Sequence, residues 1–491
     1  HGRQAYRLME ASRAPRFAAE NDADRVCYAP ADIFAAGERN HHISNTAYPI
    51  AHEQTFKPYR VKRAEQEPVI LGGFTPGTEL CLYSHIPFCE KRCYFCEYTV
   101  VGRDELTQTA EYMQALNHEV ELYAEKLGHP ALSGWDIGGG TPSFVSAELM
   151  ADHIAAVRMM FSFAPGFAIS IETTPRIASL EPDKIVAYRE MGIERISMGV
   201  QVTEPDLLKA LGRDTNGLEH NYRATENIRR AGFRKFNLDL MYGFAGQSDE
   251  SWRTTLEHSI AMAPDYITLY RMRYKLTRIS DQAGRVTMEQ VLRQARMAKE
   301  LLAAAGYVAN PGKNTYSRLA GDTGTSAYLT RRVIKGTPYL GVGLGAQSFT
   351  SSTISYNSGS VGKNLAPYLK DVASNRLPLQ DLYHLPRAHM MAKMIAVSFY
   401  FGEINLAAFY ARFGITLEAA YPQATLFALQ EGLMHYTDSV NGAELNDLDH
   451  RSLSLTEKGA RHFNGTIALF FAPSVQHYLL GRNQAEIYAA V

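Results

Sequence analysis

The stretch CEKRCYFCEY, residues 89–98, places three of the chain's five cysteines within eight positions. Its spacing is C-x3-C-x2-C, and it directly follows a strand-like apolar run, LYSHIPF at 82–88. The charged residues between the first two cysteines argue against a buried apolar role for this segment. Cys27 and Cys81 lie outside the cluster, and we predict that neither is a ligand.

Three closely spaced thiols indicate a metal centre, and two kinds of centre come into question. A structural zinc site takes four protein ligands, and no nearby C-x2-C or H-x3-H pair supplies the fourth. Three thiolates instead suit a [4Fe-4S] cluster whose fourth iron is open to another ligand. We therefore predict that Cys89, Cys93 and Cys96 bind such a cluster, with a zinc-containing structural protein as the rival class.

Length and composition restrict the fold class and the partners. The 491 residues suffice for one large α/β domain with appendages, and 46% of them are apolar. A formal net charge of −1 gives no electrostatic footprint for nucleic acid or an anionic membrane, so neither partner is expected. We see no apolar run long enough to span a bilayer. The few clustered cysteines do not resemble a secreted disulfide framework, which predicts a cytoplasmic location.

Apolar runs bounded by turn residues alternate with amphipathic stretches along the first two thirds of the chain. The predicted strands are 80–88, 135–139, 167–173, 195–201, 235–243 and 266–274. A helix is predicted between the first two strands, with Gly128 as its C-cap. Six β-α units in series predict a parallel barrel or sheet, with chemistry at the carboxyl ends of the strands.

The cluster loop resembles that of radical S-adenosylmethionine (SAM) enzymes. More narrowly, YSHIPFCEKRCYFC at 83–96 resembles the oxygen-independent coproporphyrinogen III oxidase (HemN-like) family. Further motifs match that family in order: WDIGGGTPSF (135–144), SIETTP (170–175), RISMGVQ (195–201), LGRD (211–214), NLDLMYG (237–243) and YLGVGLGAQS (339–348). The resemblance covers roughly residues 80–350 strongly and the C-terminal part weakly.

This resemblance implies an α/β fold in three parts. Residues 80–350 would form a partial (β/α)6 radical SAM barrel that holds the [4Fe-4S] cluster. Residues 1–79 would be an N-terminal extension that wraps the barrel. Residues 351–491 would form a C-terminal helical domain resembling a winged helix.

The resemblance also implies positions that bind SAM. Glycines let a backbone approach a ligand closely, and the planar fork of Arg213 suits a carboxylate. A Glu that ends a core strand needs a polar partner, which favours a ligand contact for Glu172. The complete set of cofactor-binding residues implied by the family is Tyr83, Gly139, Gly140, Thr141, Glu172, Gln201, Arg213 and Asp239.

The HemN-like resemblance further implies a second SAM molecule beside the first. In this chain Arg273 and Gln347 would frame that second site. Glu97 stands where the oxidases carry a small residue, and TLYRMRYKL at 268–276 holds two arginines where they have smaller or neutral residues. We predict catalytic roles for Arg273, Gln347 and Glu97.

These departures favour the related class C radical SAM methyltransferases and cyclopropanases. One SAM would be cleaved to a 5′-deoxyadenosyl radical, and the second would donate a one-carbon unit to an sp2 carbon of a small-molecule natural product. The alternative is oxidative decarboxylation of coproporphyrinogen III or related haem metabolism. A non-catalytic SAM- or haem-binding chaperone is a further rival. The expected partners are a small-molecule substrate and an electron donor such as flavodoxin or ferredoxin.

Overall fold

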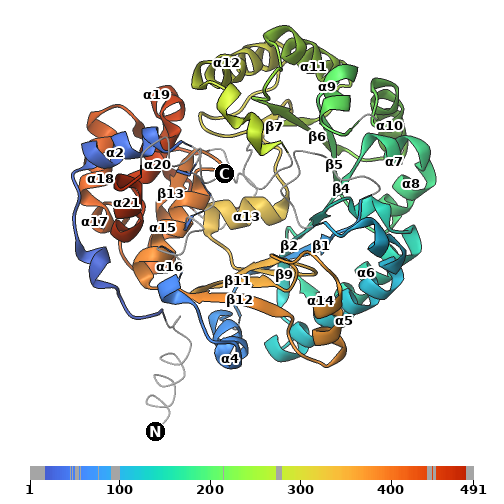
Figure 1. Ribbon diagram of the computed structural model, residues 1–491, viewed down its shortest axis with the longest axis horizontal. Coiled ribbons are helices and arrows are strands. Elements are labelled where there is room, and N and C mark those ends of the chain that lie inside the picture. Colours follow the sequence, from blue (N-terminus) through green and yellow to red (C-terminus); the bar gives the residue numbers. More distant parts are fainter. Residues whose placement is uncertain are drawn as a thin grey trace.

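The computed structural model describes residues 17–89, 100–213, 215–272, 279–439, 445 and 449–482, except for 42, 45, 47, 50–54, 56 and 76 (Figure 1). Within these ranges the chain forms one large mixed sheet, a small three-stranded sheet, and helices around both. Strand order in the large sheet is β12-β11-β10-β9-β1-β2-β4-β5-β6-β7-β8, with β3 paired to β2.

The central strands run parallel and confirm the six strands predicted from the sequence. They are β1 (Leu80–Ile86), β2 (Ala131–Gly139), β4 (Ile169–Thr173), β5 (Arg195–Gln201), β6 (Lys235–Tyr242) and β7 (Tyr266–Arg271), with the short β3 (Ser162–Phe163) beside β2. After β7 the order ends with β8 (Thr315–Ser317), which is antiparallel. The strands curve into an open ring, which Figure 1 views along its opening.

Helices connect the parallel strands and cover the outside of the ring. They are α5 (Thr109–Leu127), α6 (Ala147–Met160), α7 (Pro175–Leu180), α8 (Pro182–Glu190), α9 (Pro205–Ala210), α10 (Leu218–Arg230), α11 (Asp249–Ala261) and α12 (Met288–Ala304). Gly128 ends α5 in the left-handed region at φ 75°, as its predicted C-cap role requires. Trp135 on β2 and Trp252 on α11 are among the largest fully buried side chains, and both belong to the apolar cluster between strands and helices.

The sheet continues on the other side of β1 and past residue 350. Its added strands are β9 (Tyr339–Val342), β10 (Gln347–Phe349), β11 (Thr353–Asn357) and β12 (Leu379–His384), of which only β9 is parallel to its neighbour β1. Helix α13 (Ala327–Lys335) precedes β9 and lies across the middle of the ring in Figure 1. Helix α14 (Ala366–Ala373) packs against α5.

The described part of the N-terminal segment contacts mainly C-terminal elements. Helix α2 (Pro30–Arg39) packs on α20 (Phe463–Ala468) and α21 (Pro473–Leu480), and α4 (Arg63–Gly73) lies against β11 and β12. The same blue-beside-red packing is visible in Figure 1. The described N-terminal and C-terminal segments therefore lie together on one side of the ring.

The C-terminal part combines helices with the small sheet, whose order is β13-β15-β14. Its elements are α15 (Arg387–Ser398), β13 (Glu403–Asn405), α16 (Leu406–Phe413), α17 (Leu417–Ala420), α18 (Pro422–Gln430), β14 (Met434–Asp438), β15 (Arg451–Leu455) and α19 (Glu457–Arg461). The winged-helix-like character of this part stays a prediction.

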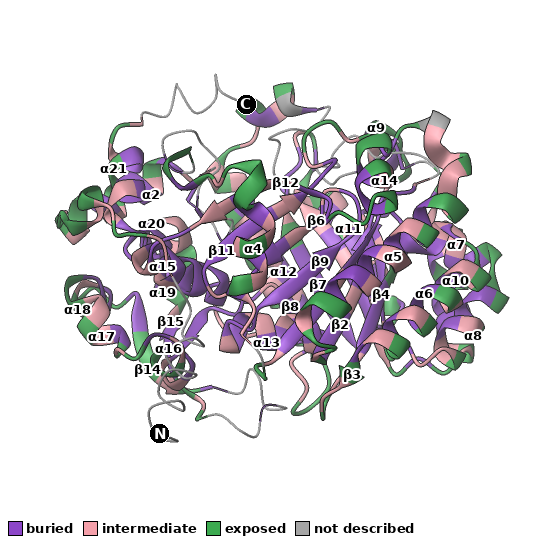
Figure 2. Ribbon diagram, turned by 90° about the horizontal axis from the view of Figure 1, so that it is seen from below, coloured by how far each residue is buried: buried purple, intermediate pink, exposed green. Residues whose placement is uncertain are grey.

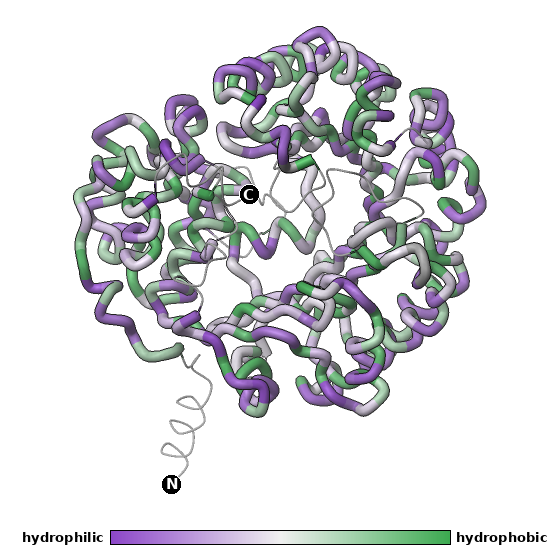
Figure 3. Tube along the Cα trace, in the orientation of Figure 1, coloured by the Kyte–Doolittle hydropathy of each residue, from purple (hydrophilic) through white to green (hydrophobic). Residues whose placement is uncertain are grey.

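Burial follows the layers. Figure 2 shows the strands mostly buried and the helices exposed on their outer sides, and Figure 3 shows strongly hydrophilic stretches on the peripheral helices. One large apolar cluster joins the strands to the helices outside them, and a second fills the C-terminal part. Of the helices that the structure describes, none combines the length and apolarity needed to cross a membrane.

Candidate functional site

Two loops meet where β1 and β2 end. Gly140 N donates a hydrogen bond to Ile86 O at 2.9 Å, and Thr141 N donates to Phe88 O at 2.8 Å. These bonds place the half-buried thiol of Cys89 with its Sγ 3.3 Å from the Thr141 hydroxyl oxygen. The first predicted cluster ligand therefore lies at the carboxyl edge of the parallel strands, where chemistry was expected.

The glycine triplet at 138–140, which overlaps the end of β2, is required by close packing. A Cβ at Gly140 would lie 2.8 Å from Cys89 Sγ, and one at Gly139 would lie 2.5 Å from Ile86 O. Gly139 also adopts φ +131°, a conformation that L side chains rarely adopt. A Cβ at Gly138 would reach within 3.2 Å of Glu172 Oε2. The bare backbone thus lies between the cysteine loop and the strand that carries Glu172.

Three carboxylates gather inside the ring, on neighbouring or nearby strands. Asp239 accepts hydrogen bonds from Ser197 Oγ at 3.1 Å and Asn237 Nδ2 at 2.9 Å. Asp136 accepts one from Ser326 Oγ at 3.0 Å, while its other oxygen is buried without a hydrogen-bond partner among the described residues. Glu172 accepts one from the backbone of Gly139.

Enclosure by protein, and then the charges of Asp239 and Asp136, raise the pKa of Glu172 to about 8. Burial raises the pKa of Asp136 to about 6 and also raises that of Asp239. Glu172 is exposed to the space inside the ring of strands, which we call the lumen, and water in the lumen can therefore reach it. The lumen therefore stabilises a cation brought to these three acids.

Arg195, at the start of β5, supplies the compensating positive charge, and sequence reasoning did not identify it. Its guanidinium donates to Ser170 Oγ at 3.3 Å and to Gly324 O at 3.0 Å, and lies over the Tyr266 ring. The same charge lowers the pKa of all three acids without outweighing their enclosure. Strand alternation was the available signal, since Arg195 and Ser197 share one face of β5.

Two predicted residues meet at the end of β5. Arg213 is 7% exposed and its Nη2 donates to Gly199 O. Gln201 adopts φ 65°, an uncommon conformation for a residue other than glycine, and its Oε1 is buried without a hydrogen-bond partner in the described chain. A Cβ at Gly199 would lie only 2.9 Å from Gln201 Nε2. An amide oxygen and a guanidinium are thus held at one edge of the lumen.

Tyr83 extends the site along β1. Its hydroxyl lies 3.1 Å from His85 Nδ1, and it also faces the space beside Gly138. His85 was not among the predicted site residues, although its position two residues after Tyr83 on one strand places both on the same face.

Gln347 occupies a different position from the carboxylates. Its Oε1 accepts a hydrogen bond from Tyr339 Oη, and its Nε2 donates to Tyr356 Oη at 3.0 Å. Its amide is therefore held by two tyrosines of the added strands β9 and β11. The catalytic role of Gln347 stays a prediction. Four other predicted residues, Arg273, Glu97, Cys93 and Cys96, lie outside the residues that the structure describes.

Glu119 on α5 is a further residue that the sequence reasoning missed. The fully buried carboxylate accepts hydrogen bonds from Gly343 N and Tyr368 Oη, both at 2.7 Å, and from Asn357 Nδ2 at 2.8 Å. Burial raises its pKa to about 7. It fixes the glycine-rich segment between β9 and β10. An acidic residue in the buried stripe of an amphipathic helix was the signal that could have revealed it.

The described residues fit a [4Fe-4S] cluster and SAM on chemical grounds. No three His, Cys, Asp or Glu within the described ranges could hold a metal together, and two of the three predicted ligands fall outside those ranges. Cys89 nevertheless presents its thiol beside bare glycine backbone. SAM carries a sulfonium, an ammonium and a carboxylate, which match the acids of the lumen and the guanidinium of Arg213.

Comparisons with known proteins agree with this assignment. Residues 83–258 match the radical SAM superfamily, and the chain therefore contains a radical SAM domain. A coproporphyrinogen III oxidase of Cereibacter sphaeroides, named "anaerobic 1", is 27% identical over 71% of this chain and 78% of its own length. An oxygen-independent coproporphyrinogen III oxidase of Bradyrhizobium diazoefficiens is 34% identical, and the heme chaperone HemW of Mycobacterium tuberculosis is 33% identical.

The extent of these matches differs. The Bradyrhizobium match spans 40% of this chain and 43% of that protein, and the HemW match spans 42% and 53%. Among solved structures, coproporphyrinogen III oxidase (HemN) from Escherichia coli aligns with a TM-score of 0.68 at 22% identity, over 87% of this chain and 96% of that one. That likeness shows the α/β radical SAM fold expected from the sequence.

Proposed function

We propose that this chain is a radical SAM enzyme that oxidatively decarboxylates the propionate side chains of a porphyrinogen such as coproporphyrinogen III. The observation that carries the radical SAM assignment is the Cys89 thiol, held against Gly140 and Thr141 at the rim of an acidic lumen. The Cereibacter relatives, which cover about the same 71% of the chain, support the porphyrinogen substrate through their names.

The sequence favoured one-carbon transfer from a second SAM, with porphyrinogen decarboxylation as the alternative. The relatives are named coproporphyrinogen oxidases or heme chaperones, and these names favour the alternative. Glu97 and Arg273 differ from the residues of the oxidases and favoured one-carbon transfer. Both lie outside the described residues, so the structure gives no geometry that supports this reading. We therefore retain the second SAM and the methylated or cyclopropanated product only as outcomes of the experiment below.

Different residues would bind the cluster and SAM. Cys89, with Cys93 and Cys96, would hold the cluster, and the backbone of Gly139 and Gly140 would lie beside SAM. Bound together, the cluster and SAM supply a hydrogen-abstracting radical by one-electron cleavage of SAM.

The protein's own contribution is orientation and charge. Glu172 and Asp239 would attract the cationic groups of SAM, and Arg213 would bind its carboxylate. Protein surrounds these acids on the strands of the ring, and the lower dielectric there strengthens these interactions. A carboxylate that is protonated before SAM binds, as a raised pKa implies for Glu172, must release its proton to pair with a cation.

The overall reaction determines which co-reactants are needed and which products must be measured. Each propionate would lose carbon dioxide, one hydrogen atom and one electron to become a vinyl group, so a one-electron acceptor is required alongside SAM. The anaerobically reconstituted protein would be incubated with SAM, a low-potential reductant, an electron acceptor and coproporphyrinogen III. We expect carbon dioxide and 5′-deoxyadenosine together, and no S-adenosylhomocysteine.

Other outcomes have distinct signatures. S-adenosylhomocysteine formed in step with 5′-deoxyadenosine, with a product that gains one carbon, would replace the proposal by one-carbon transfer. Tight haem binding with neither product would indicate a chaperone. A Cys89→Ala protein treated in the same way is the control for chemistry that does not depend on the cluster.

A further inference from the structure

The loop at 243–247, with the sequence GFAGQ, joins β6 to α11 directly after the strand that carries Asp239. Three glutamines gather around this loop: Gln247 within it, and Gln290 and Gln294 one helical turn apart on α12. Helices α11 and α12 pack against each other, and both lie near β6 in Figure 1. All three glutamines lie outside the set of residues assigned above to SAM.

The side-chain amides of these glutamines hold the backbone of the loop. Gln247 Oε1 accepts hydrogen bonds from Gly243 N at 2.9 Å and from Phe244 N at 3.3 Å. Gln294 Oε1 also accepts from Gly243 N, at 3.0 Å, and its Nε2 donates to Gln247 O at 3.1 Å. Gln290 Nε2 donates to Phe244 O at 2.9 Å. Gln247 and Gln294 are buried, so these bonds are shielded from water.

The loop requires an amide at position 247. Gln247 Nε2 donates to Met241 O at 3.4 Å, so this one side chain both accepts and donates. A carboxylate could only accept, and an apolar side chain would leave the buried N–H groups of Gly243 and Phe244 with fewer partners. The conformation of the loop therefore depends on Gln247.

Phe244 links this loop to the residues that follow β5. Its side chain is 1% exposed and belongs to a small apolar cluster that also contains Val202 and Leu211. Val202 is the neighbour of Gln201 in the chain, and Leu211 stands two positions before Arg213. The packing of Phe244 therefore supports both segments that carry these two residues.

A hydrogen bond from α11 supports the turn at Gln201 as well. Thr203 N donates to Thr255 Oγ1 at 3.1 Å, and Thr255 is fully buried on α11. Gln201 itself adopts φ 65°, a conformation that persists only where the surrounding structure holds it. Its Oε1 is buried with no hydrogen-bond partner among the described residues, so its orientation matters for any donor that a ligand brings.

We propose that Gln247 is a positioning residue for SAM binding. It shapes the loop so that Phe244 supports the segments that carry Gln201 and Arg213. Gln247 itself does not contact SAM and acts only through Phe244. This role rests on the proposed binding of SAM at the carboxyl edge of the strands.

Gln247→Met tests the role, because it removes the amide and keeps the length of the side chain. In the anaerobically reconstituted full chain, we expect the dissociation constant of SAM to rise roughly ten-fold, as for a misaligned charged hydrogen bond, with iron content unchanged. The KM of SAM in its reductive cleavage should rise with it, while kcat at saturating SAM should stay within about two-fold of the native value. Hydrogen exchange should become faster at 243–247 and also at 200–213.

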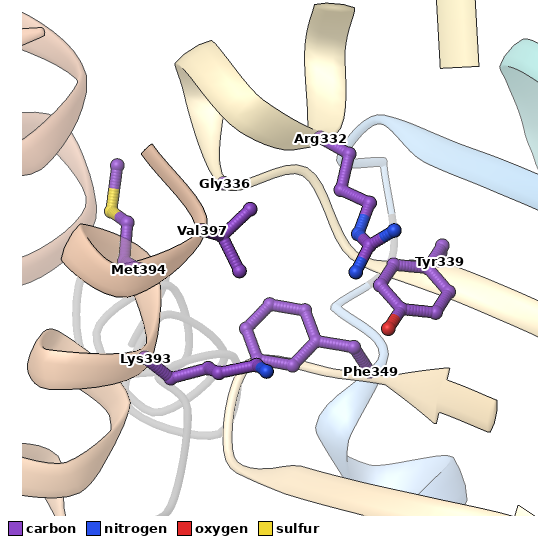
Figure 4. A pocket seen from close by; sticks show the side chains of 7 residues that line it. All are labelled: Arg332, Gly336, Tyr339, Phe349, Lys393, Met394 and Val397. Carbon is purple, nitrogen blue, oxygen red and sulfur yellow. The ribbon is translucent and has the colours of Figure 1, made fainter. Parts of the chain in front are cut away.

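Val397→Ala is the matched control for a general loss of stability. Val397 is buried on α15 and lines a small pocket between the barrel and the C-terminal helices (Figure 4). Its truncation should lower the Tm, yet leave SAM binding and hydrogen exchange at 200–213 as in the native protein. Phe244→Leu is a second test that leaves the glutamine amides intact, and it should weaken SAM binding by a smaller factor than Gln247→Met.

Equal SAM affinity of Gln247→Met and the native protein would overturn the proposal, and so would faster exchange confined to 243–247. SAM binding weakened to the same degree in Val397→Ala would overturn it too, since stability alone would then explain the loss. If Gln247→Met does not fold, the SAM affinity of Phe244→Leu decides: a reduced affinity supports the role and an unchanged one excludes it. A native protein that binds no SAM would overturn the proposed function itself, and this proposal with it.

Discussion

The sulfur of Cys89 lies 3.3 Å from the hydroxyl oxygen of Thr141, although 52 positions separate the two residues in the chain. The loop after β2 forms hydrogen bonds with the loop after β1, and Gly140 lies directly against the sulfur. The position of Cys89, the proposed cluster ligand, therefore depends on a neighbouring strand. This dependence can be tested without changing any cysteine.

Gly140→Ala should displace the thiol. The new Cβ would lie 2.8 Å from Cys89 Sγ and 2.9 Å from Phe88 O, so the cysteine loop must shift. We expect iron content after anaerobic reconstitution to fall well below that of the native protein, at a stability cost of about 1–3 kcal/mol. Gly102→Ala is the matched control, because a Cβ there meets no described atom within 4 Å. Equal iron content in both variants would contradict this account.

Replacing single cysteines should distinguish the proposed cluster ligand from the cysteines that do not bind the cluster. Cys27 is exposed, whereas Cys81 is fully buried with its Sγ 3.9 Å from Tyr328 O, and burial raises the pKa of its thiol. A thiol with a raised pKa is a poor ligand because metals bind the thiolate. We expect Cys89→Ala to lose the iron and the brown absorption, and Cys27→Ala and Cys81→Ala to retain both. Iron retained in Cys89→Ala would exclude the proposed cluster.

The pKa of Glu172 predicts a proton release on SAM binding. Because its pKa is raised to about 8, the carboxyl is mostly protonated at pH 7 before SAM arrives. A cation favours the carboxylate, so binding should release a proton, and affinity should increase as the pH rises toward about 8. Calorimetry at pH 7 in two buffers of different ionisation enthalpy measures this release.

Glu172→Gln should abolish that buffer dependence and weaken SAM binding by about 1–3 kcal/mol, while iron content stays unchanged. Tyr410→Phe, at an exposed position of α16 remote in sequence from the site, should behave like the native protein. Proton release that persists in Glu172→Gln would assign it to another group, and Asp136 would be the next to test.

The central strands could be predicted from the sequence because each is a run of apolar residues ending in turn residues. Segment 195–201 was predicted with the bounds that β5 has in the structure. The strands beyond β1 were missed: β11 and β12 are as long as β4 and β7, whereas β10 contains only Gln347–Phe349 and has no periodicity to read. Such short strands form because a neighbouring strand offers its edge, and that edge exists only in the folded protein.

Only some of the residues at the site could be predicted from the sequence, for a similar reason. Glu172 and Asp239 stand in motifs at strand ends, so their proximity followed from the topology. Asp136 on β2 and Arg195 on β5 both pair with Ser170, two positions before Glu172 on β4, and their joint effect on Glu172 depends on which strands are neighbours in the sheet. Sequence spacing along one strand carries no information about that relation.

Glu119 should give the protein a pH-dependent stability. Its pKa is about 7 when folded, against an ordinary 4.5, so the folded state keeps a proton that the unfolded state has lost between these values. Stability should therefore decrease as the pH rises through this window. Glu119→Gln cannot ionise, so its unfolding free energy should vary less with pH, and the altered hydrogen bonds should cost about 1–3 kcal/mol. Chemical denaturation at pH 5 and at pH 8 compares the two, and identical slopes would contradict the assignment.

The contact between Asp24 and His389 predicts how firmly the N-terminal segment is attached. His389 Nε2 lies 2.7 Å from Asp24 Oδ2, and both side chains are almost fully buried. Ser474 N donates to the other oxygen of Asp24 at 2.9 Å, and Tyr48 Oη lies 2.8 Å from His389 Nδ1. Removing one member of such a group leaves the others buried without a partner, which typically costs roughly 3–5 kcal/mol.

Asp24→Ala should therefore accelerate limited proteolysis around residues 17–40, and Asp22→Ala should not, since the Asp22 side chain is 93% exposed. Burial opposes ionisation of Asp24, but the hydrogen bonds from His389 and Ser474 outweigh it and lower its pKa below 3.8. The stabilisation is thus fully present above pH 3.8 and is lost as the pH falls through the lowered pKa. Native protein should become as protease-sensitive as Asp24→Ala only at such acidic pH, measured with an acid-active protease. Equal cleavage rates for Asp24→Ala and Asp22→Ala at neutral pH would show that other contacts hold the segment.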